Sequence, residues 1–251
     1  MQRPWPYPRI LAHRGGGKLA PENTLAGFRK AAELGFGGVE FDVMLTADAV
    51  PVVIHDETLE RTTDGHGEVA KTSRAALELL DAGAWFDPAY RGERVPAFEQ
   101  VGKLCVDLGL WANVEIKPAQ GFEHETGTAT AVLARDLWRN APLAPILSSF
   151  QPAALEAARG GAPELLRGFL TDRIEPGWRT EAARLECVSV HTNYRDLTAA
   201  RAKEIRDAGY WLLCYTVNDP DTARKLFSWG VDAIFTDRLD LIPPDFARAP
   251  G

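Results

Sequence analysis

The stretch GGVEFDVMLTADAVPVVIHD, residues 37–56, predicts how the rest of the chain is arranged. Glu40 and Asp42 occupy alternate positions of an apolar run, so in a β-strand both carboxylates project from the same face. After a short turn, residues 50–54 form a second apolar run that ends at His55. If the two runs pair as an antiparallel hairpin, His55 returns beside the two acids. Because buried neighbouring carboxylates require a cation or hydrogen bonds, this hairpin predicts the centre of an active site.

Strand-like and helix-like segments alternate along most of the chain. The first strand-like runs are at 9–12, 39–43 and 111–117. Further strand–helix units follow them, and the last strand-like run is at 233–236. The hairpin return is too close to its partner for a helical crossover, which leaves eight strand–helix repeats. These repeats predict a parallel eight-stranded (β/α)8 TIM barrel of the α/β class. A doubly wound open sheet is the alternative, disfavoured because the glycine-rich segment 13–17 lacks the G-x-G-x-x-G spacing.

We expect one TIM-barrel domain over residues 1–251, since such barrels commonly contain roughly 250 residues. The irregular segment 57–95 is too long for a simple connection and has one helical piece at 73–80. We interpret it as a small insertion after the second strand that lies over the C-terminal face of the barrel. Among the later elements, the pattern predicts a helix at 127–140 and a strand at 187–191.

The charge and the cysteines exclude several kinds of partner and compartment. The formal net charge is −7 and no block of Lys or Arg stands out, so we expect neither nucleic acid nor a membrane surface as a partner. The cysteines Cys105, Cys187 and Cys214 are odd in number and lie in apolar runs, which indicates reduced thiols. Residues 1–10 have too few consecutive apolar residues for a signal peptide, and no run approaches the 18 or so apolar residues of a membrane span, so we expect neither. We therefore expect a cytoplasmic protein with a small-molecule substrate.

The polar residues at the strand ends test the barrel prediction, because reactive groups of such barrels lie at the C-terminal ends of the strands. The ionisable groups at these ends gather on the first three strands, and they are His13, Arg14, Glu40, Asp42, His55, Asp56, Glu115 and Lys117. The later strands deliver Ser148, Ser149, His191, Thr216, Asn218, Thr236 and Asp237. This asymmetry indicates that the chemistry occurs beside the first three strands.

Glu40, Asp42 and Glu115 are the candidate metal ligands. Three carboxylates without a nearby thiolate form a hard oxygen site, which suits one divalent cation such as Mg²⁺, Ca²⁺ or Mn²⁺ better than zinc. A purely structural network of salt bridges with Arg14 and Lys117 is the alternative. Carboxylates this dense inside a fold more often mark a functional site, which favours metal binding.

His13 and His55 are the candidate catalytic residues, because imidazoles transfer protons near neutral pH. Arg14 and Lys117 are the candidate phosphate ligands, the first through a bidentate fork and the second as a point charge. Of the other histidines, His66 and His124 are expected at the surface, and His191 is a weaker pocket candidate. Ser148 and Ser149 lack the G-x-S-x-G elbow of a serine nucleophile.

Six segments, in their order along the chain, resemble the signature of the glycerophosphodiester phosphodiesterase family. They are His13-Arg14-Gly15, Pro21-Glu22-Asn23-Thr24, Glu40-Phe41-Asp42-Val43, His55-Asp56, Glu115-Ile116-Lys117 and Phe235-Thr236-Asp237. The resemblance extends from Ile10 to about Pro244, and Val231-Asp232-Ala233 and the insertion with Trp85 resemble the cytoplasmic bacterial branch. Ala49 departs from the pattern, since many relatives carry glycine at this place in the hairpin turn.

The resemblance implies a (β/α)8 barrel and metal-dependent hydrolysis of a glycerophosphodiester to sn-glycerol 3-phosphate and an alcohol, such as choline, ethanolamine or glycerol. It implies that one divalent cation binds to Glu40, Asp42 and Glu115. It also implies an acid–base pair, His13 and His55, and phosphate ligands, Arg14 and Lys117. Which histidine is the acid, and whether water or the glycerol hydroxyl attacks phosphorus, stay open. Loop position suggests apolar walls for the alcohol from Trp85, Phe150 and Trp211.

Two other functions are possible from the residues alone. A phospholipase-type lyase would stop at a cyclic phosphate, but the chain has no apolar membrane-seeking segment. A non-catalytic barrel would only bind phosphorylated ligands, but every expected catalytic position is filled. The preferred alcohol, the physiological metal and the oligomeric state are not indicated by the sequence.

Overall fold

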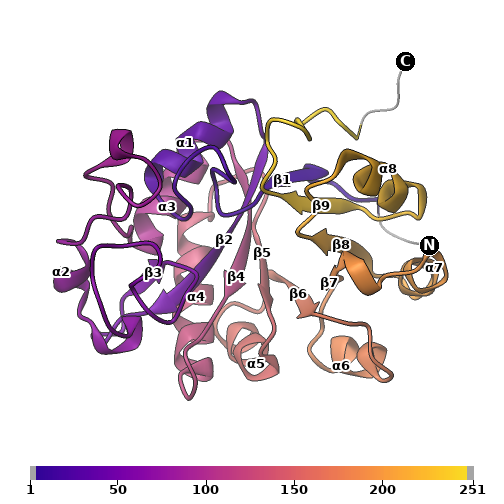
Figure 1. Cartoon of the computed structure of the whole chain (residues 1–251). Coiled ribbons are helices and arrows are strands. Elements are labelled where there is room, and N and C mark those ends of the chain that lie inside the picture. The colour runs from indigo at the N-terminus through magenta and orange to yellow at the C-terminus, as the bar shows by residue number, and fades with distance from the viewer. Residues whose placement is uncertain (1–3, 248–251) are drawn as a thin grey trace.

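A computed structural model describes residues 4–247, and its eight parallel strands close into a barrel with the helices around the outside (Figure 1). The barrel strands are β1 (Ile10–Ala12), β2 (Gly38–Leu45), β4 (Trp111–Ile116), β5 (Ile146–Ser149), β6 (Leu166–Thr171), β7 (Ser189–Asn193), β8 (Trp211–Tyr215) and β9 (Ala233–Thr236). The barrel closes where β1 pairs with β2, with Ala12 opposite Val39. The predicted TIM barrel is confirmed.

The helices follow the strands as the alternation predicts. They are α1 (Leu25–Glu33), α2 (Arg74–Leu77), α3 (Phe98–Leu108), α4 (Glu123–Leu137), α5 (Pro152–Gly161), α6 (Trp178–Arg184), α7 (Ala199–Asp207) and α8 (Pro220–Ser228). Local sequence defines their ends: the Thr24 hydroxyl accepts from the Gly27 amide at the start of α1, and Gly109 adopts a left-handed φ of 68° after α3. In the part of the chain that the structure describes, no helix is both long and apolar enough for a membrane span.

The ninth strand, β3 (Pro51–Val53), is not one of the barrel strands. It runs antiparallel to β2, with Val53 opposite Val43, and the Ile54 amide donates to the Asp42 carbonyl at 3.1 Å. The predicted hairpin is therefore confirmed, and it places His55 next to the mouth of the barrel.

The segment 57–95 lies between β3 and α3. It contains the 3-10 helices η1 (Val69–Lys71) and η2 (Pro88–Tyr90) besides the short α2, so the helix predicted at 73–80 forms only in its first part. Buried side chains of this segment and of the hairpin form a separate apolar cluster. From the hairpin come Met44, Val52 and Ile54, and from the segment come Leu59, Val69, Leu77, Ala82 and Val95. We propose that this segment is the expected insertion, supported by the hydrogen bond from the Tyr90 hydroxyl to the Leu19 carbonyl beside the first strand–helix loop.

Helix α4 and strand β7 begin at other residues than the sequence predicts. Helix α4 begins at Glu123, four residues before the predicted start, because acidic residues in a polar segment form its first turn, where the helix dipole favours them. Strand β7 begins at Ser189 rather than at residue 187. The Cys187 amide instead donates to the Ala182 carbonyl at the end of helix α6. The sequence does not show this difference, because an apolar residue before a strand looks like part of the strand.

An aromatic cluster fills the N-terminal end of the barrel. Trp211 begins β8 there and makes an edge-to-face contact with Trp5, whose ring also contacts Trp111 and Tyr7. The expectation that Trp211 forms a wall of the active site is therefore wrong, because it lies at the start of its strand and the mouth lies at the strand ends.

The hairpin turn contains a strained residue. Ala49 has a φ of 59°, a left-handed conformation that costs a non-glycine residue roughly 1–2 kcal/mol. We expect Ala49→Gly to raise the free energy of unfolding by about 0.5–1 kcal/mol, because part of the relief is offset by the greater entropy of unfolded glycine. Urea denaturation measures this, with Ala47→Gly as the control outside the left-handed region. A loss of stability in Ala49→Gly would contradict the assignment of strain.

Candidate active site at the mouth of the barrel

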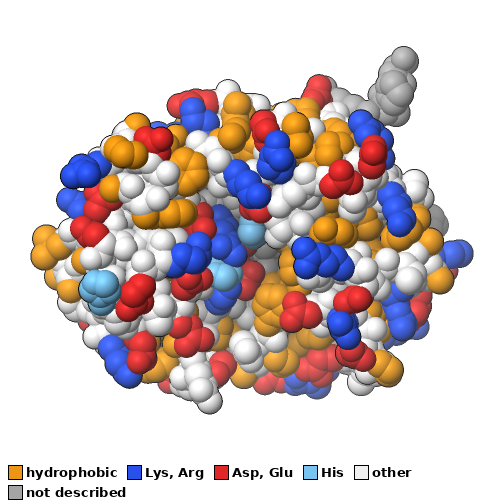
Figure 2. All heavy atoms as spheres, in the orientation of Figure 1, with side chains coloured by type: hydrophobic (Ala, Val, Ile, Leu, Met, Phe, Trp, Pro, Cys, Tyr) orange, Lys and Arg blue, Asp and Glu red, His pale blue; other side chains and the backbone are white. Residues whose placement is uncertain are grey.

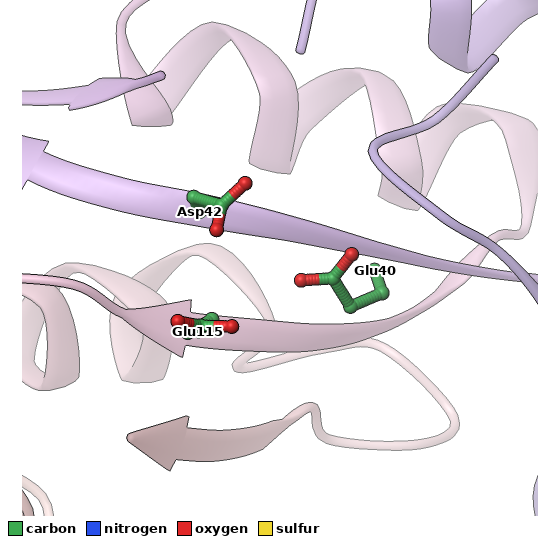
Figure 3. Close-up of side chains that lie close together, drawn as sticks. All are labelled: Glu40, Asp42 and Glu115. Carbon is green, nitrogen blue, oxygen red and sulfur yellow. The ribbon is translucent and has the colours of Figure 1, made fainter. Parts of the chain in front are cut away.

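The three predicted metal ligands converge from two neighbouring strands (Figure 3). Glu40 and Asp42 project from β2, and the parallel register places Asp42 directly beside Glu115 of β4. One carboxylate oxygen from each of the three residues lies within 4.8 Å of the others. The alternation in the sequence thus produces the shared face that it predicts, and the strand pairing adds the third acid.

Burial makes this acidic cluster unusual. All eight residues of β2 are buried. Burial, reinforced by the charges of Asp42 and Glu115, raises the pKa of Glu40 well above its usual value. Burial and the Asp42 charge raise the pKa of Glu115 to about 8. Burial alone would raise the pKa of Asp42 too, but Arg14, His55 and Lys117 outweigh it and lower that pKa.

The oxygen atoms of the cluster are only partly satisfied by the protein. Asn23 donates to Oδ2 of Asp42 at 2.9 Å, and the Arg14 amide donates to Oε2 of Glu40 at 3.3 Å. Oε1 of Glu115 is buried and has no hydrogen-bond partner. An unpaired buried carboxylate oxygen beside two further carboxylates matches the oxygen ligands that a hard divalent cation prefers. These residues therefore fit a divalent cation.

His13 follows β1 and lies between two acids. Its Nδ1 lies 2.6 Å from Oδ1 of Asp237, and its Nε2 lies 3.7 Å from Oε2 of Glu40. Asp237 follows β9 and also accepts a hydrogen bond from Asn218 at 2.9 Å. Burial raises the pKa of Asp237, but these hydrogen bonds together with the charges of His13 and Arg14 outweigh it and lower that pKa to about 2. An ionised Asp237 therefore fixes the orientation of the His13 ring.

His55, at the end of the hairpin, has a different environment. Its Nδ1 lies 2.6 Å from Oδ1 of Asp56, and its Nε2 lies 2.5 Å from Nζ of Lys117. Because a lysine ammonium only donates, this contact assigns the Nε2 atom as the acceptor and Nδ1 as the proton carrier. Burial lowers the pKa of His55, and Arg14 and Lys117 lower it further against the attraction of Asp42.

Arg14 follows β1 and Lys117 follows β4, the two strands that pair with β2 on either side, so the two basic side chains flank the acids. Nε of Arg14 lies 3.7 Å from Oδ2 of Asp42, and Nζ of Lys117 lies 3.7 Å from Oδ1 of the same residue. Nη1 of Arg14 also donates to Glu22 at 2.7 Å. The salt bridges of the structural alternative are thus present, but they engage Asp42 and leave Oε1 of Glu115 unpaired.

Two adjoining cavities open at this end of the barrel, where Figure 2 shows a hollow lined by histidine, basic and acidic side chains. The first, of about 270 Å³, contains all seven predicted site residues beside an apolar wall, and its lining is His13, Arg14, Glu40, Asp42, His55, Glu115, Lys117, Phe150, Leu170, Tyr215, Thr216 and Phe235. The second, of about 490 Å³, shares His13 and Arg14 with the first and adds Trp85 and Phe86 of the segment 57–95. Two of the three expected apolar walls, Phe150 and Trp85, therefore border these cavities.

The sequence prediction missed the residues that orient the imidazoles. Asp56 and Asp237 were placed at strand ends without a role, although Asp56 directly follows His55 in the sequence. Two further residues, Glu22 and Arg61, extend the site, and no periodic signal marks Arg61 in its irregular segment. Ser149 has a structural role instead, since its hydroxyl donates to the Ile116 carbonyl.

His191 does not line either cavity, and its burial gives a test of stability. Complete burial lowers its pKa to about 3, whereas an unfolded histidine titrates near 6.5. The unfolded chain therefore binds a proton between these pH values that the folded protein does not, and stability falls as the pH falls through that window. We expect the free energy of unfolding to fall by on the order of 3 kcal/mol between pH 7 and pH 4 because of His191.

Urea denaturation of the wild type and of His191→Gln at the two pH values measures this contribution. The variant retains a polar group for the Ser189 hydroxyl, which lies 2.9 Å from Nε2 of His191. The pH dependence should be smaller in the variant by the stated amount. Equal pH dependence in the two proteins would contradict a neutral buried imidazole.

A closed (β/α)8 barrel with acidic, imidazole and basic side chains around one cavity at the strand ends has the architecture of an enzyme. Residues 13–241 match the glycerophosphoryl diester phosphodiesterase family. A glycerophosphodiester phosphodiesterase of Caldanaerobacter subterraneus subsp. tengcongensis is 36% identical over 230 residues, which cover 91% of this chain and 93% of that protein. The chain belongs to the glycerophosphoryl diester phosphodiesterase family and is an enzyme.

Solved structures of similar proteins agree with this assignment. An Oleispira antarctica phosphodiesterase, solved in complex with the product sn-glycerol-3-phosphate, is 37% identical with a TM-score of 0.87, over 92% of this chain and 93% of that one. A protein of Silicibacter pomeroyi described as a glycerophosphoryl diester phosphodiesterase is 27% identical with a TM-score of 0.83, over 98% and 94% of the two chains.

Proposed function

We propose that this enzyme hydrolyses glycerophosphodiesters such as glycerophosphocholine or glycerophosphoethanolamine to sn-glycerol 3-phosphate and an alcohol, with one divalent cation and two histidines. One observation carries the proposal: three carboxylates, two buried and one half-buried, and two imidazoles, each oriented by its own aspartate, border one cavity. The product named for the Oleispira antarctica relative supports the glycerol phosphate part of the substrate.

The proposed cation ligands are Glu40, Asp42 and Glu115, and the candidates are Mg²⁺, Ca²⁺ and Mn²⁺. When bound, such a cation neutralises these acids and stabilises negative charge on the phosphoryl oxygens. Arg14 and Lys117 bind the same oxygens from the protein side. Their charges are already held at the mouth by Asp42, so they need no rearrangement as charge grows in the transition state.

The two cavities suggest how the substrate lies. The smaller cavity contains the acids and has an apolar wall that includes Phe150 and Tyr215, which suits the glycerol phosphate that all substrates share. The larger cavity, with Trp85 and Phe86, suits the variable alcohol. The scissile phosphate then lies at His13 and Arg14, the residues common to both cavities.

This arrangement favours different roles for the two histidines. His13 borders the alcohol cavity and lies between the carboxyl groups of Asp237 and Glu40, so we propose it as the general acid for the departing alcohol. His55 borders only the glycerol cavity of the two and has Nε2 free of a proton beside a cation, so we propose it as the general base.

We also propose a cytoplasmic location. The cysteines Cys105, Cys187 and Cys214 are all free and buried, and burial raises the pKa of each thiol. Reduced structural thiols support a reducing compartment.

Release of sn-glycerol 3-phosphate from glycerophosphocholine tests the proposed function. Purified enzyme should form this product and choline in equal amounts, lose the activity in chelator, and recover it with one of the three cations. Phosphorus NMR of the product identifies glycerol 3-phosphate directly. A cyclic phosphate as the final product would instead establish the lyase, and full activity in chelator would contradict the proposed metal site.

A further inference from the structure

The insertion places one arginine against the catalytic residues. Arg61 forks onto two carboxylates: Nε and Nη2 donate to Asp56 at 2.5 and 3.0 Å, and Nη1 and Nη2 donate to Glu22 at 2.8 Å each. All three nitrogen atoms of the guanidinium are therefore used. Only the planar guanidinium offers donors in this double-fork geometry, which a lysine ammonium does not reproduce.

Each of the two carboxylates holds a residue of the proposed chemistry. Asp56 pairs with Nδ1 of His55 at 2.6 Å, and Glu22 accepts from Nη1 of Arg14 at 2.7 Å. Arg61 is thus the link between the proposed general base and the proposed phosphate ligand, which come from the hairpin and from the loop after β1. The Arg61 hydrogen bond is also the main reason that the pKa of Asp56 is lowered.

The loop that Arg14 and Glu22 define is strained. Arg14 has a φ of 51°, a left-handed conformation that its side chain disfavours, and Asn23 has a φ of 56°, which asparagine tolerates better than most residues. The Asn23 amide donates to the Arg14 carbonyl at 2.9 Å, and the Asn23 side chain donates to Asp42. A loop in this conformation requires fixed partners at its edge, and Arg61 supplies one of them through Glu22.

We propose that Arg61 is a positioning residue that fixes the His55 ring through Asp56 and the Arg14 guanidinium through Glu22, so that the insertion aligns the base and the phosphate ligand together. The inference rests on the proposed function for its kinetic test. Arg61 touches neither of the two cavities, so its effect passes through these two acids.

The segment around Arg61 has its own anchors, so the substitution can be made without removing the loop. Leu59 and Thr63 are buried, and the amide and hydroxyl of Thr63 both donate to the Leu59 carbonyl. The Arg61 side chain itself is 44% exposed. Arg61→Gln should therefore fold, and thermal denaturation checks this against the matched control Arg94→Gln, whose guanidinium donates to the Leu79 carbonyl within the same insertion.

Imidazole NMR at fixed pH tests the His55 branch without any activity. A hydrogen-bonded Nδ1 proton signal, assigned to His55 by its loss in His55→Gln, should be present in the wild type and in Arg94→Gln and be lost or shifted in Arg61→Gln. The corresponding signal of His13, which pairs with Asp237, is the internal control and should not change. An unchanged His55 signal in Arg61→Gln would overturn the proposal even if the wild type proved inactive.

Kinetics test whether both branches matter for glycerophosphocholine hydrolysis. Arg61→Gln should lower kcat by about 10- to 100-fold with KM changed by less than about threefold, while Arg61→Lys recovers part of the loss. In the background Asp56→Ala with Glu22→Ala, the same substitution should cost less than about threefold, because neither acceptor of its hydrogen bonds remains. Equal losses in both backgrounds, or wild-type kcat in Arg61→Gln, would show that Arg61 does not position the site. An inactive wild type would instead count against the proposed function.

Discussion

Glu115→Gln is expected to lower kcat/KM for glycerophosphocholine by about 10³-fold, the effect of losing several kcal/mol of charge stabilisation. Glutamine retains the size of the side chain and removes one anionic ligand from the cluster. Glu115 is the member whose Oε1 has no protein partner, so cation binding is its expected use. Cation affinity, measured by calorimetry on chelator-treated protein, should fall together with activity.

The stability of Glu115→Gln separates this loss from misfolding. Burial and Asp42 raise the pKa of Glu115 to about 8, so in the cation-free protein its ionised form is disfavoured by folding. Removing the charge should leave the cation-free protein at least as stable as the wild type at pH 8. Glu125→Gln, at an exposed position of α4, is the matched control and should retain activity, affinity and stability. An unstable Glu115→Gln, or one that binds cations normally, would contradict the account.

His13→Ala and His55→Ala are each expected to lower kcat by about 10²- to 10⁴-fold, because each removes one proton transfer. The proposed roles predict a difference between them when the leaving group changes. A p-nitrophenyl ester of glycerol 3-phosphate releases a stable phenolate that hardly needs a proton. His13→Ala should therefore regain much of its activity on this substrate, whereas His55→Ala should not.

A control at the surface completes the comparison. His66 is 86% exposed and His66→Ala should behave as the wild type with both substrates. Recovery of His55→Ala rather than His13→Ala would reverse the assigned roles. Equal losses on both substrates would show that neither histidine protonates the departing alcohol.

The barrel and its acidic face could be predicted because they depend on local periodicity. Alternation in β2 places Glu40 and Asp42 together, and the eight strand–helix repeats predict the closed parallel sheet that the structure has. The position of Trp211 could not be inferred, because apolar residues at the start and the end of a barrel strand look alike in the sequence. Arg61 was not predicted because its partners Glu22 and Asp56 meet only through the path of an irregular segment.

The central claim is that acids from two strands bind one divalent cation between the imidazoles. The most direct measurement is an anomalous-scattering map from a crystal of this protein soaked with Mn²⁺. We expect one peak at roughly 2.0–2.6 Å from a carboxylate oxygen of each of Glu40, Asp42 and Glu115. A map without a peak at these residues, or with its main peak elsewhere, would contradict the claim.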